Sequence, residues 1–133
     1  MVKIAGRGPE RICYNRAAMQ ERQGHPKRIF AYDEALALLP EVRRLTEEAY
    51  ERAQLVGATL SAGGAIGADA QDKLSVIVQQ WAEALTREGL EVKGLWLVDF
   101  DNGSGYYCWR YPEEGLHYYH SYEEGFGGRM RIQ

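Results

Sequence analysis

The sequence predicts an α+β fold, in which an antiparallel helical hairpin packs on a small, mostly antiparallel three-stranded sheet. Two observations predict this arrangement. Between residues 33 and 88, apolar residues recur every three or four positions, which is the period of an amphipathic helix. After Gly89 the chain becomes aromatic and β-branched, and it contains an Asn-Gly dipeptide, the strongest short signal for a β-hairpin.

The length and composition fit one domain in a reducing compartment. The chain has 133 residues, 45% of them hydrophobic and 26% charged, enough for one modest core. No apolar run approaches the roughly 20 residues that cross a bilayer, and the N-terminus lacks the apolar stretch of a secretory signal. We therefore expect a cytoplasmic protein that does not enter the membrane, with Cys13 and Cys108 as free thiols.

Residues 1–28 differ in charge from the rest of the chain. They carry seven Lys/Arg and two acidic residues, whereas residues 29–133 are acidic overall. With several Gly and Pro among them, they predict a basic N-terminal extension before a single domain at 29–133. This extension could contact nucleic acid or lie on the acidic body. Tyr14 is its one aromatic residue, which disfavours nucleic acid as the partner.

Two helices are predicted, at about 33–56 and 68–88. Asp33 and Glu34 favour the start of the first helix, and Gly89 ends the second. The apolar stripes contain Val42, Leu45, Ala49, Ala53 and Val56 in the first helix, and Leu74, Ile77 and Trp81 in the second. The segment 57–68 between them is rich in glycine but lacks the GxGxxG or Gly-Lys-Ser/Thr pattern of a phosphate loop, so we expect a flexible link.

Three strands are predicted, at about 95–101, 104–111 and 116–120. A two-residue Asn102-Gly103 turn places Asp99 opposite Tyr106. Alternation then predicts an aromatic face that packs on the helices, formed by Trp96, Val98, Phe100, Tyr107, Trp109 and Tyr111. The other face is mixed and contains Leu95, Leu97, Asp99, Tyr106, Cys108 and Arg110. A five-residue turn would instead reverse which faces match.

Residues of metal-ligand type lie between positions 99 and 124, but their spacing matches no common metal motif. A calcium loop beginning at Asp99 would need Gly and Glu where Ser104 and Arg110 stand. His117 and His120 are an odd number of residues apart, so a straight strand points them to opposite faces. With no HxH, HExxH or paired CxxC, we predict no metal site and no cofactor.

The candidate site residues have two interpretations. They form either a ligand-binding pocket or a buried polar lock, meaning polar groups that only hold strands together. They are Asp99, Cys108, Trp109, His120, Glu123 and Arg129. A nucleophilic Cys108 would need a partner such as His120 to lower its thiol pKa. No catalytic residue can be assigned, and we favour the polar lock.

The glycines near the C-terminus are a second candidate. Gly125, Gly127 and Gly128 could form a backbone nest that holds an anion beside Arg129. The alternative is a turn that seats Phe126 in the core, with Arg129 paired to an acidic side chain.

Four segments carry a family resemblance: RIFAYDEALALLPEV (28–42), GLEVKGLWLVDF (89–100), YCW (107–109) and YHSYEEGFGGR (119–129). In this order they resemble the bacterial domain-of-unknown-function family 2203. The chain departs from the family pattern at Trp96, where Gly is expected, at Asp101, where Pro is expected, and at Tyr119, where Trp is expected. The resemblance implies no activity, but it marks Asp99, Phe100, Cys108, Trp109, His120, Gly125, Phe126, Gly128 and Arg129 as positions of interest.

Two functions stay open. We favour a non-catalytic binding or interaction module that self-associates, because no catalytic constellation passes a spacing test. A thin two-layer body with nine tyrosines and three tryptophans also predicts a homodimer. The alternative is a small enzyme or a ligand- or metal-binding protein, with a pocket around Asp99, Cys108, His120, Glu123 and Arg129. The sequence does not indicate which small ligand such a pocket would take.

Overall fold

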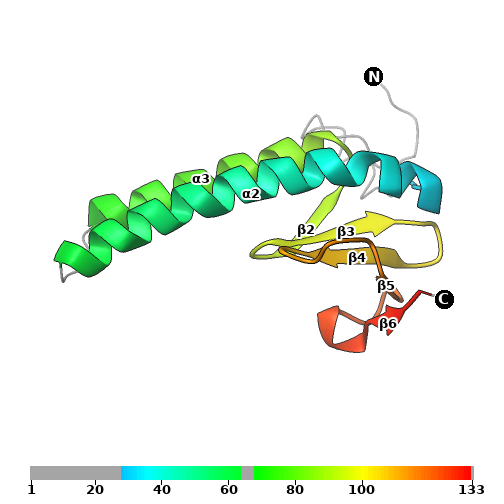
Figure 1. Cartoon of the computed structure of the whole chain (residues 1–133). Coiled ribbons are helices and arrows are strands. Elements are labelled where there is room, and N and C mark those ends of the chain that lie inside the picture. The colour runs from blue at the N-terminus through cyan, green and yellow to red at the C-terminus, as the bar shows by residue number, and fades with distance from the viewer. Residues whose placement is uncertain (1–27, 64–67, 133) are drawn as a thin grey trace, which may run out of the picture.

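The computed structural model describes residues 28–63 and 68–132, in which two helices lie over one face of an antiparallel sheet (Figure 1). The predicted α+β class is confirmed, but the sheet has five strands, not three. The elements are α2 (Tyr32–Gly63), α3 (Ala68–Arg87), β2 (Glu91–Gly94), β3 (Leu97–Asp101), β4 (Tyr106–Arg110), β5 (Tyr118–His120), the 3₁₀ turn η1 (Phe126–Gly128) and β6 (Met130–Arg131). The strands follow one another in the sheet in sequence order. All of the predicted basic extension except Arg28 lies outside the described residues.

The helix α2 starts one residue before its predicted position and ends later. Glu34 caps the start of the helix, because its carboxylate accepts a hydrogen bond from the backbone N–H of Ala31 at 2.8 Å. Pro40 lies inside the helix, which continues past residue 56 to Gly63. The glycine-rich segment is therefore helical up to Gly63, because adding a residue to an existing helix costs less than starting one. Neither described helix is long and apolar enough to cross a membrane.

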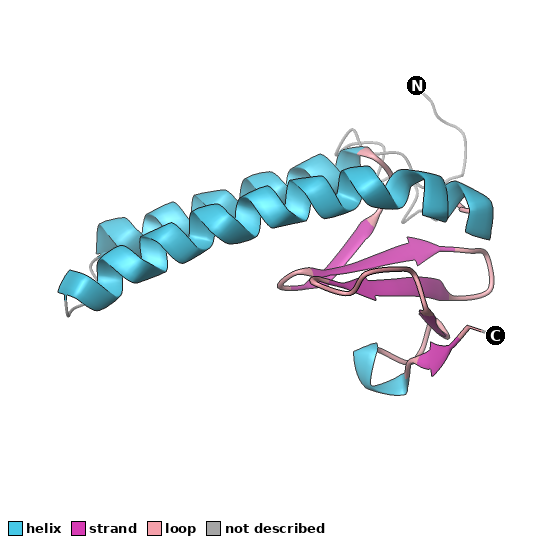
Figure 2. Cartoon of the chain, viewed as in Figure 1, coloured by secondary structure: helices cyan, strands magenta, loops and turns pink. Residues whose placement is uncertain are grey.

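Both helices continue past the strands of the sheet (Figure 2). The last buried core residues toward this end are Ala49 in α2 and Ile77 in α3. We call residues 51–63 and 68–76 the helical arm. Among the described residues, the two helices of the arm lie beside each other and beyond the strands of the sheet.

A buried hydrogen bond joins the two helices nearer the sheet. The indole Nε1–H of Trp81 donates to Thr46 Oγ1 at 2.8 Å. The Thr46 hydroxyl in turn donates to the carbonyl of Val42 at 2.7 Å. Thr46 is fully buried and Trp81 is 3% exposed, so no water replaces either bond.

The sheet begins earlier than predicted, because residues before 95 form a strand of their own. A tight turn at Leu95 and Trp96 joins β2 to β3. Trp96 has a φ of 62°, a left-handed conformation that glycine adopts at the lowest cost. The indole is held by ring contacts with Tyr50 at 5.7 Å and Trp81 at 5.0 Å. The glycine that the resemblance led us to expect at this position would suit this backbone conformation.

The β3–β4 register differs from the predicted one by two residues. Asp99 lies opposite Cys108, and Asp101 opposite Tyr106. The connection is longer than a two-residue turn, and Asn102 N–H donates to the carbonyl of Gly105 at 2.8 Å. The predicted pairing of Asp99 with Tyr106 is therefore wrong. An even shift leaves every side chain on its face, so the aromatic face still packs on the helices.

The hydrophobic core lies between this aromatic face and the helices. Val98, Phe100 and Trp109 are fully buried in it, with Trp96, Tyr107 and Tyr111 at its margin. Facing them from the helical layer are Ala35, Leu39, Val42, Ala49, Ile77, Trp81 and Leu85. Beyond β4 the chain returns as β5, and β6 pairs with β5 at the sheet edge.

We expect Thr46→Val to destabilise the fold by about 2 kcal/mol, because the isosteric side chain leaves the buried Trp81 indole N–H without an acceptor. Thr46→Ser keeps the hydroxyl and should cost about 1 kcal/mol, through its lost methyl group. Denaturant unfolding of both variants measures the difference. A Thr46→Val protein as stable as the unchanged chain would contradict this role.

We expect Trp96→Ala to be less stable than Trp96→Gly by about 1 kcal/mol, because alanine retains the cost of the left-handed backbone. Both variants should be less stable than the unchanged chain, since each loses the packing on Tyr50 and Trp81. Equilibrium unfolding in urea tests the order. Equal stability of the two variants would show that the turn does not hold this conformation.

Candidate functional site

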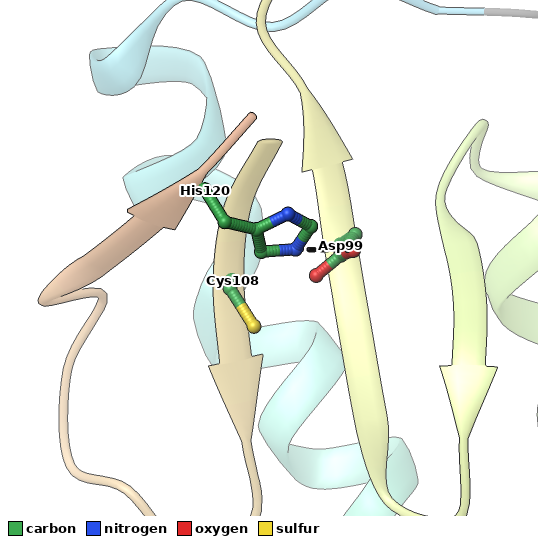
Figure 3. Close-up of side chains that lie close together, drawn as sticks. All are labelled: Asp99, Cys108 and His120. Carbon is green, nitrogen blue, oxygen red and sulfur yellow. Dashed lines mark hydrogen bonds and ion pairs between the residues drawn. The ribbon is translucent and has the colours of Figure 1, made fainter. Parts of the chain in front are cut away.

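Three of the predicted site residues meet on the sheet face that points away from the helices (Figure 3). Asp99 comes from β3, Cys108 from β4 and His120 from β5. The strand register brings them together. Asp99 lies directly opposite Cys108, and His120 lies opposite Tyr106, which is two residues before Cys108 on the same face of β4. One ligand-type atom from each of the three side chains lies within 4.8 Å of the other two.

This Asp99–Cys108–His120 cluster is buried. The exposed fractions are 1% for Asp99, 0% for Cys108 and 3% for His120. The Tyr106 ring lies over His120, with ring centroids 5.4 Å apart. Lys93 reaches the cluster from the solvent side, with its Nζ 3.7 Å from Asp99 Oδ2 and its side chain 37% exposed.

The hydrogen bonds of His120 determine which ring nitrogen carries a proton. Nδ1 lies 2.8 Å from the carbonyl oxygen of Ser121. A carbonyl can only accept, so Nδ1 is the protonated nitrogen. Nε2 lies 2.9 Å from Asp99 Oδ2, and a proton must be shared between these two atoms. The second carboxylate oxygen, Asp99 Oδ1, has no hydrogen-bond partner among the residues that the structure describes.

Burial controls the electrostatics of the cluster. It raises the pKa of the Asp99 carboxyl, while Cys108, His120 and Lys93 act in the opposite direction. Burial and the adjacent Asp99 carboxyl raise the pKa of the Cys108 thiol to about 12, although Arg129 opposes the rise. At neutral pH Cys108 is therefore a thiol, not the thiolate that nucleophilic catalysis requires.

Of the two other charged residues that the sequence predicted, Arg129 borders the cluster, where its guanidinium acts to lower the pKa of the Cys108 thiol, and Glu123 lies apart from it. Arg129 forms an ion pair with Glu113, at 2.8 Å between Nη1 and Oε2. Its guanidinium also stacks on Tyr118 and Phe126, at 4.0 Å from each ring centroid. Glu123 is exposed and does not belong to the group of three.

Trp109 faces the core rather than the cluster. Its indole Nε1–H donates to the carbonyl of Glu113 at 2.9 Å. Trp109 is adjacent to Cys108 in the strand, so alternation places the two side chains on opposite faces. It acts in packing and not in the candidate site.

The glycines of the proposed anion nest lie at η1. The amide of Gly128 donates to the carbonyl of Gly125 at 2.9 Å, and that of Arg129 to the carbonyl of Phe126 at 3.2 Å. Two amides of this segment are thus used inside the turn and cannot bind an anion. Phe126 is 38% exposed, so the turn does not seat it in the core.

Sequence reasoning missed a second buried carboxylate beside the cluster. Asp101 is 2% exposed, and its Oδ1 accepts the Tyr122 hydroxyl at 2.7 Å and the amide of Gly103 at 2.9 Å. Tyr106 donates to Glu91 at 3.1 Å nearby. The spacing of Asp99 and Asp101 was a usable signal, because residues two apart in a strand share a face.

A shallow groove on the helical arm is the second candidate surface. Its volume is about 680 Å³. The lining residues are Arg52, Leu55, Val56, Asp69, Asp72, Lys73, Val76 and Ile77. Leu55 is 70% exposed and Val76 48% exposed, so apolar side chains face solvent there.

The sequence profile of one protein family, described as "Uncharacterized conserved protein (DUF2203)", matches residues 28–132. The chain belongs to this family. The matched part of the DUF2203 chain contains α2, α3, the strands β2 to β6 and the Asp99–Cys108–His120 cluster. Comparison with curated proteins and with solved structures found no match.

We expect Cys108 of the folded DUF2203 chain to react with a disulfide reagent such as DTNB at least about a hundredfold more slowly than after unfolding in guanidinium. The thiol is buried, and its raised pKa leaves little thiolate. A Cys13→Ser chain, in which Cys108 is the remaining thiol, isolates the reaction. Equal rates in the two states would contradict a buried, protonated thiol.

Proposed function

We propose that this DUF2203 chain is a non-catalytic interaction module that self-associates through its helical arm. The observation that carries the proposal is the groove on the arm, where Leu55 and Val76 expose apolar surface. Within the part of the chain that the structure describes, the arm lies beyond the sheet, so the strands do not cover its outer faces. A second hairpin would cover those faces and complete a four-helix arrangement.

The charges around the groove favour a second copy of the chain as the partner. Arg52 and Lys73 balance Asp69 and Asp72. A twofold interface brings a surface against itself, so a patch with one sign of charge would repel its copy. This patch carries both signs around an apolar floor, which suits pairing with itself. The same balance disfavours a strongly charged partner such as nucleic acid.

The state of the polar cluster supports a function without catalysis. Cys108 is a buried thiol with a raised pKa. Arg129, a cation that could otherwise bind an anionic substrate, forms an ion pair with Glu113. An acyl-transfer or hydrolytic site needs an activated nucleophile and free donors for the developing charge. Neither requirement is met by these two residues.

The test is the mass of the chain in solution. We expect the unchanged protein to have twice the 15.1 kDa mass of one chain in light scattering. Val76→Glu places a charge in the apolar floor and should shift the mass to that of a monomer, with an unchanged helical spectrum. Leu55→Glu should act in the same way.

Leu95→Glu is the matched control, because Leu95 is 56% exposed but lies in the β2–β3 turn, outside the arm. This variant should remain a dimer. A monomeric unchanged chain, or a dimer that Leu95→Glu dissociates and Val76→Glu does not, would refute association through the arm.

A further inference from the structure

The Asp99–Cys108–His120 cluster combines three residue types that bind transition metals: a carboxylate, a thiol and an imidazole. They project from three neighbouring strands toward one point, as Figure 3 shows. Local sequence spacing does not encode such a set, because strand pairing alone brings these residues together. The absence of a CxxC or HExxH motif is therefore no argument against it.

The hydrogen bonding of His120 has the pattern of a metal ligand. Its Nδ1–H donates to the backbone carbonyl of Ser121, which leaves the lone pair of Nε2 directed at Asp99. In metal sites the second ring nitrogen usually donates to a carbonyl or carboxylate in this way, and the bond holds the ring in position. Two atoms with lone pairs, Nε2 and Asp99 Oδ2, face each other at 2.9 Å and need a shared cation between them.

A single proton satisfies only part of the cluster. It links Nε2 with Oδ2, but Asp99 Oδ1 still has no hydrogen-bond partner among the described side chains and backbone groups. Asp99 is 1% exposed, so bulk solvent does not reach this oxygen. The Cys108 sulfur lies on the same side as a third donor. The cluster thus holds two protons, the shared one and that of the Cys108 thiol beside the Asp99 carboxyl, where a divalent ion could take their place.

We propose that this cluster is a binding site for a divalent transition metal ion of the Zn²⁺ class, held by Nε2 of His120, a carboxylate oxygen of Asp99 and Sγ of Cys108. Mixed nitrogen, oxygen and sulfur donors suit Zn²⁺ better than Ca²⁺ or Mg²⁺, which require oxygen ligands. The proposal replaces the sequence-based expectation that the chain has no metal site.

The distances and charges fit such an ion. Neighbouring ligand atoms of a tetrahedral zinc site lie roughly 3.3–3.6 Å apart. The three donor atoms lie within 4.8 Å of one another, so small side-chain rotations suffice. On binding, the thiol proton and the proton shared by Asp99 and His120 leave to solvent. A carboxylate, a thiolate and a neutral imidazole then balance the two charges of the ion, so the buried centre is neutral.

In the metal-free protein, the ammonium group of Lys93 supplies a positive charge near the Asp99 carboxylate. Its Nζ lies 3.7 Å from Asp99 Oδ2 and 3.5 Å from Glu91 Oε1. Because its side chain is partly exposed, the ammonium group can move toward Glu91 and solvent when an ion binds. This side of the cluster is also the route by which an ion enters and by which a water or an external ligand reaches the fourth position.

The test uses the full chain with Cys13→Ser, which leaves Cys108 as its only thiol. After chelator treatment, Co²⁺ is added and the absorption spectrum recorded. We expect one equivalent to bind with a thiolate-to-cobalt charge-transfer band, Zn²⁺ to displace it, and Zn²⁺ to raise the thermal unfolding temperature. Absence of the band in this protein overturns the proposal without any further variant.

Four substitutions test the site, two of them at proposed ligands. Cys108→Ala should remove the band, and Asp99→Asn should weaken binding about a hundredfold or more, since loss of a supporting hydrogen bond alone costs ~10–100-fold. Lys93→Gln removes the competing cation and should tighten binding. His117→Ala is the control, because His117 is exposed, and it should change nothing. Full affinity in Cys108→Ala, or an equal loss in His117→Ala and Asp99→Asn, refutes the site.

Discussion

The burial of β3 on both faces is the constraint on which the rest of the structure depends. Val98 and Phe100 point to the helices, whereas Asp99 and Asp101 point to the other side, and all four are at most 2% exposed. An apolar face is stabilised simply by exclusion from water. A carboxylate is not, so each buried Asp requires specific polar partners. The chain after β4 supplies one such partner to each, His120 to Asp99 and Tyr122 to Asp101.

The segment after β4 can be understood through this requirement. The strand β5 brings His120 to Asp99, and the residues after it bring the Tyr122 hydroxyl to Asp101. A Cβ at Gly105 would overlap the backbone oxygen of His120, so glycine is what allows β5 to approach this closely. The polar face of the sheet is thus closed by contacts that also assemble the cluster. A metal ion would cross-link the same three strands and strengthen the closure.

The cluster and the helical arm are independent parts of one molecule. The cluster lies on the sheet face that points away from the helices, whereas the arm extends past the strands, and the two share no residue. Self-association through Leu55 and Val76 and metal binding through Asp99, Cys108 and His120 therefore make separate demands on the chain. The chain can thus associate with a second copy through its arm and bind a metal ion on its sheet at the same time. An experiment can disprove one of these two proposals without affecting the other.

Periodicity in the sequence predicted what depends on local geometry alone. The α+β class, both helices and the two faces of the β3–β4 hairpin follow from side-chain spacing, and an even shift in register left the faces unchanged. The tertiary structure decided the rest. The β2 strand and the left-handed Trp96 depend on packing against Tyr50 and Trp81, and β6 is two residues long, too short for a pattern. The meeting of Asp99 and Cys108 with His120, and not with Glu123, depends on the pairing of β5 with β4, a contact that no local spacing records.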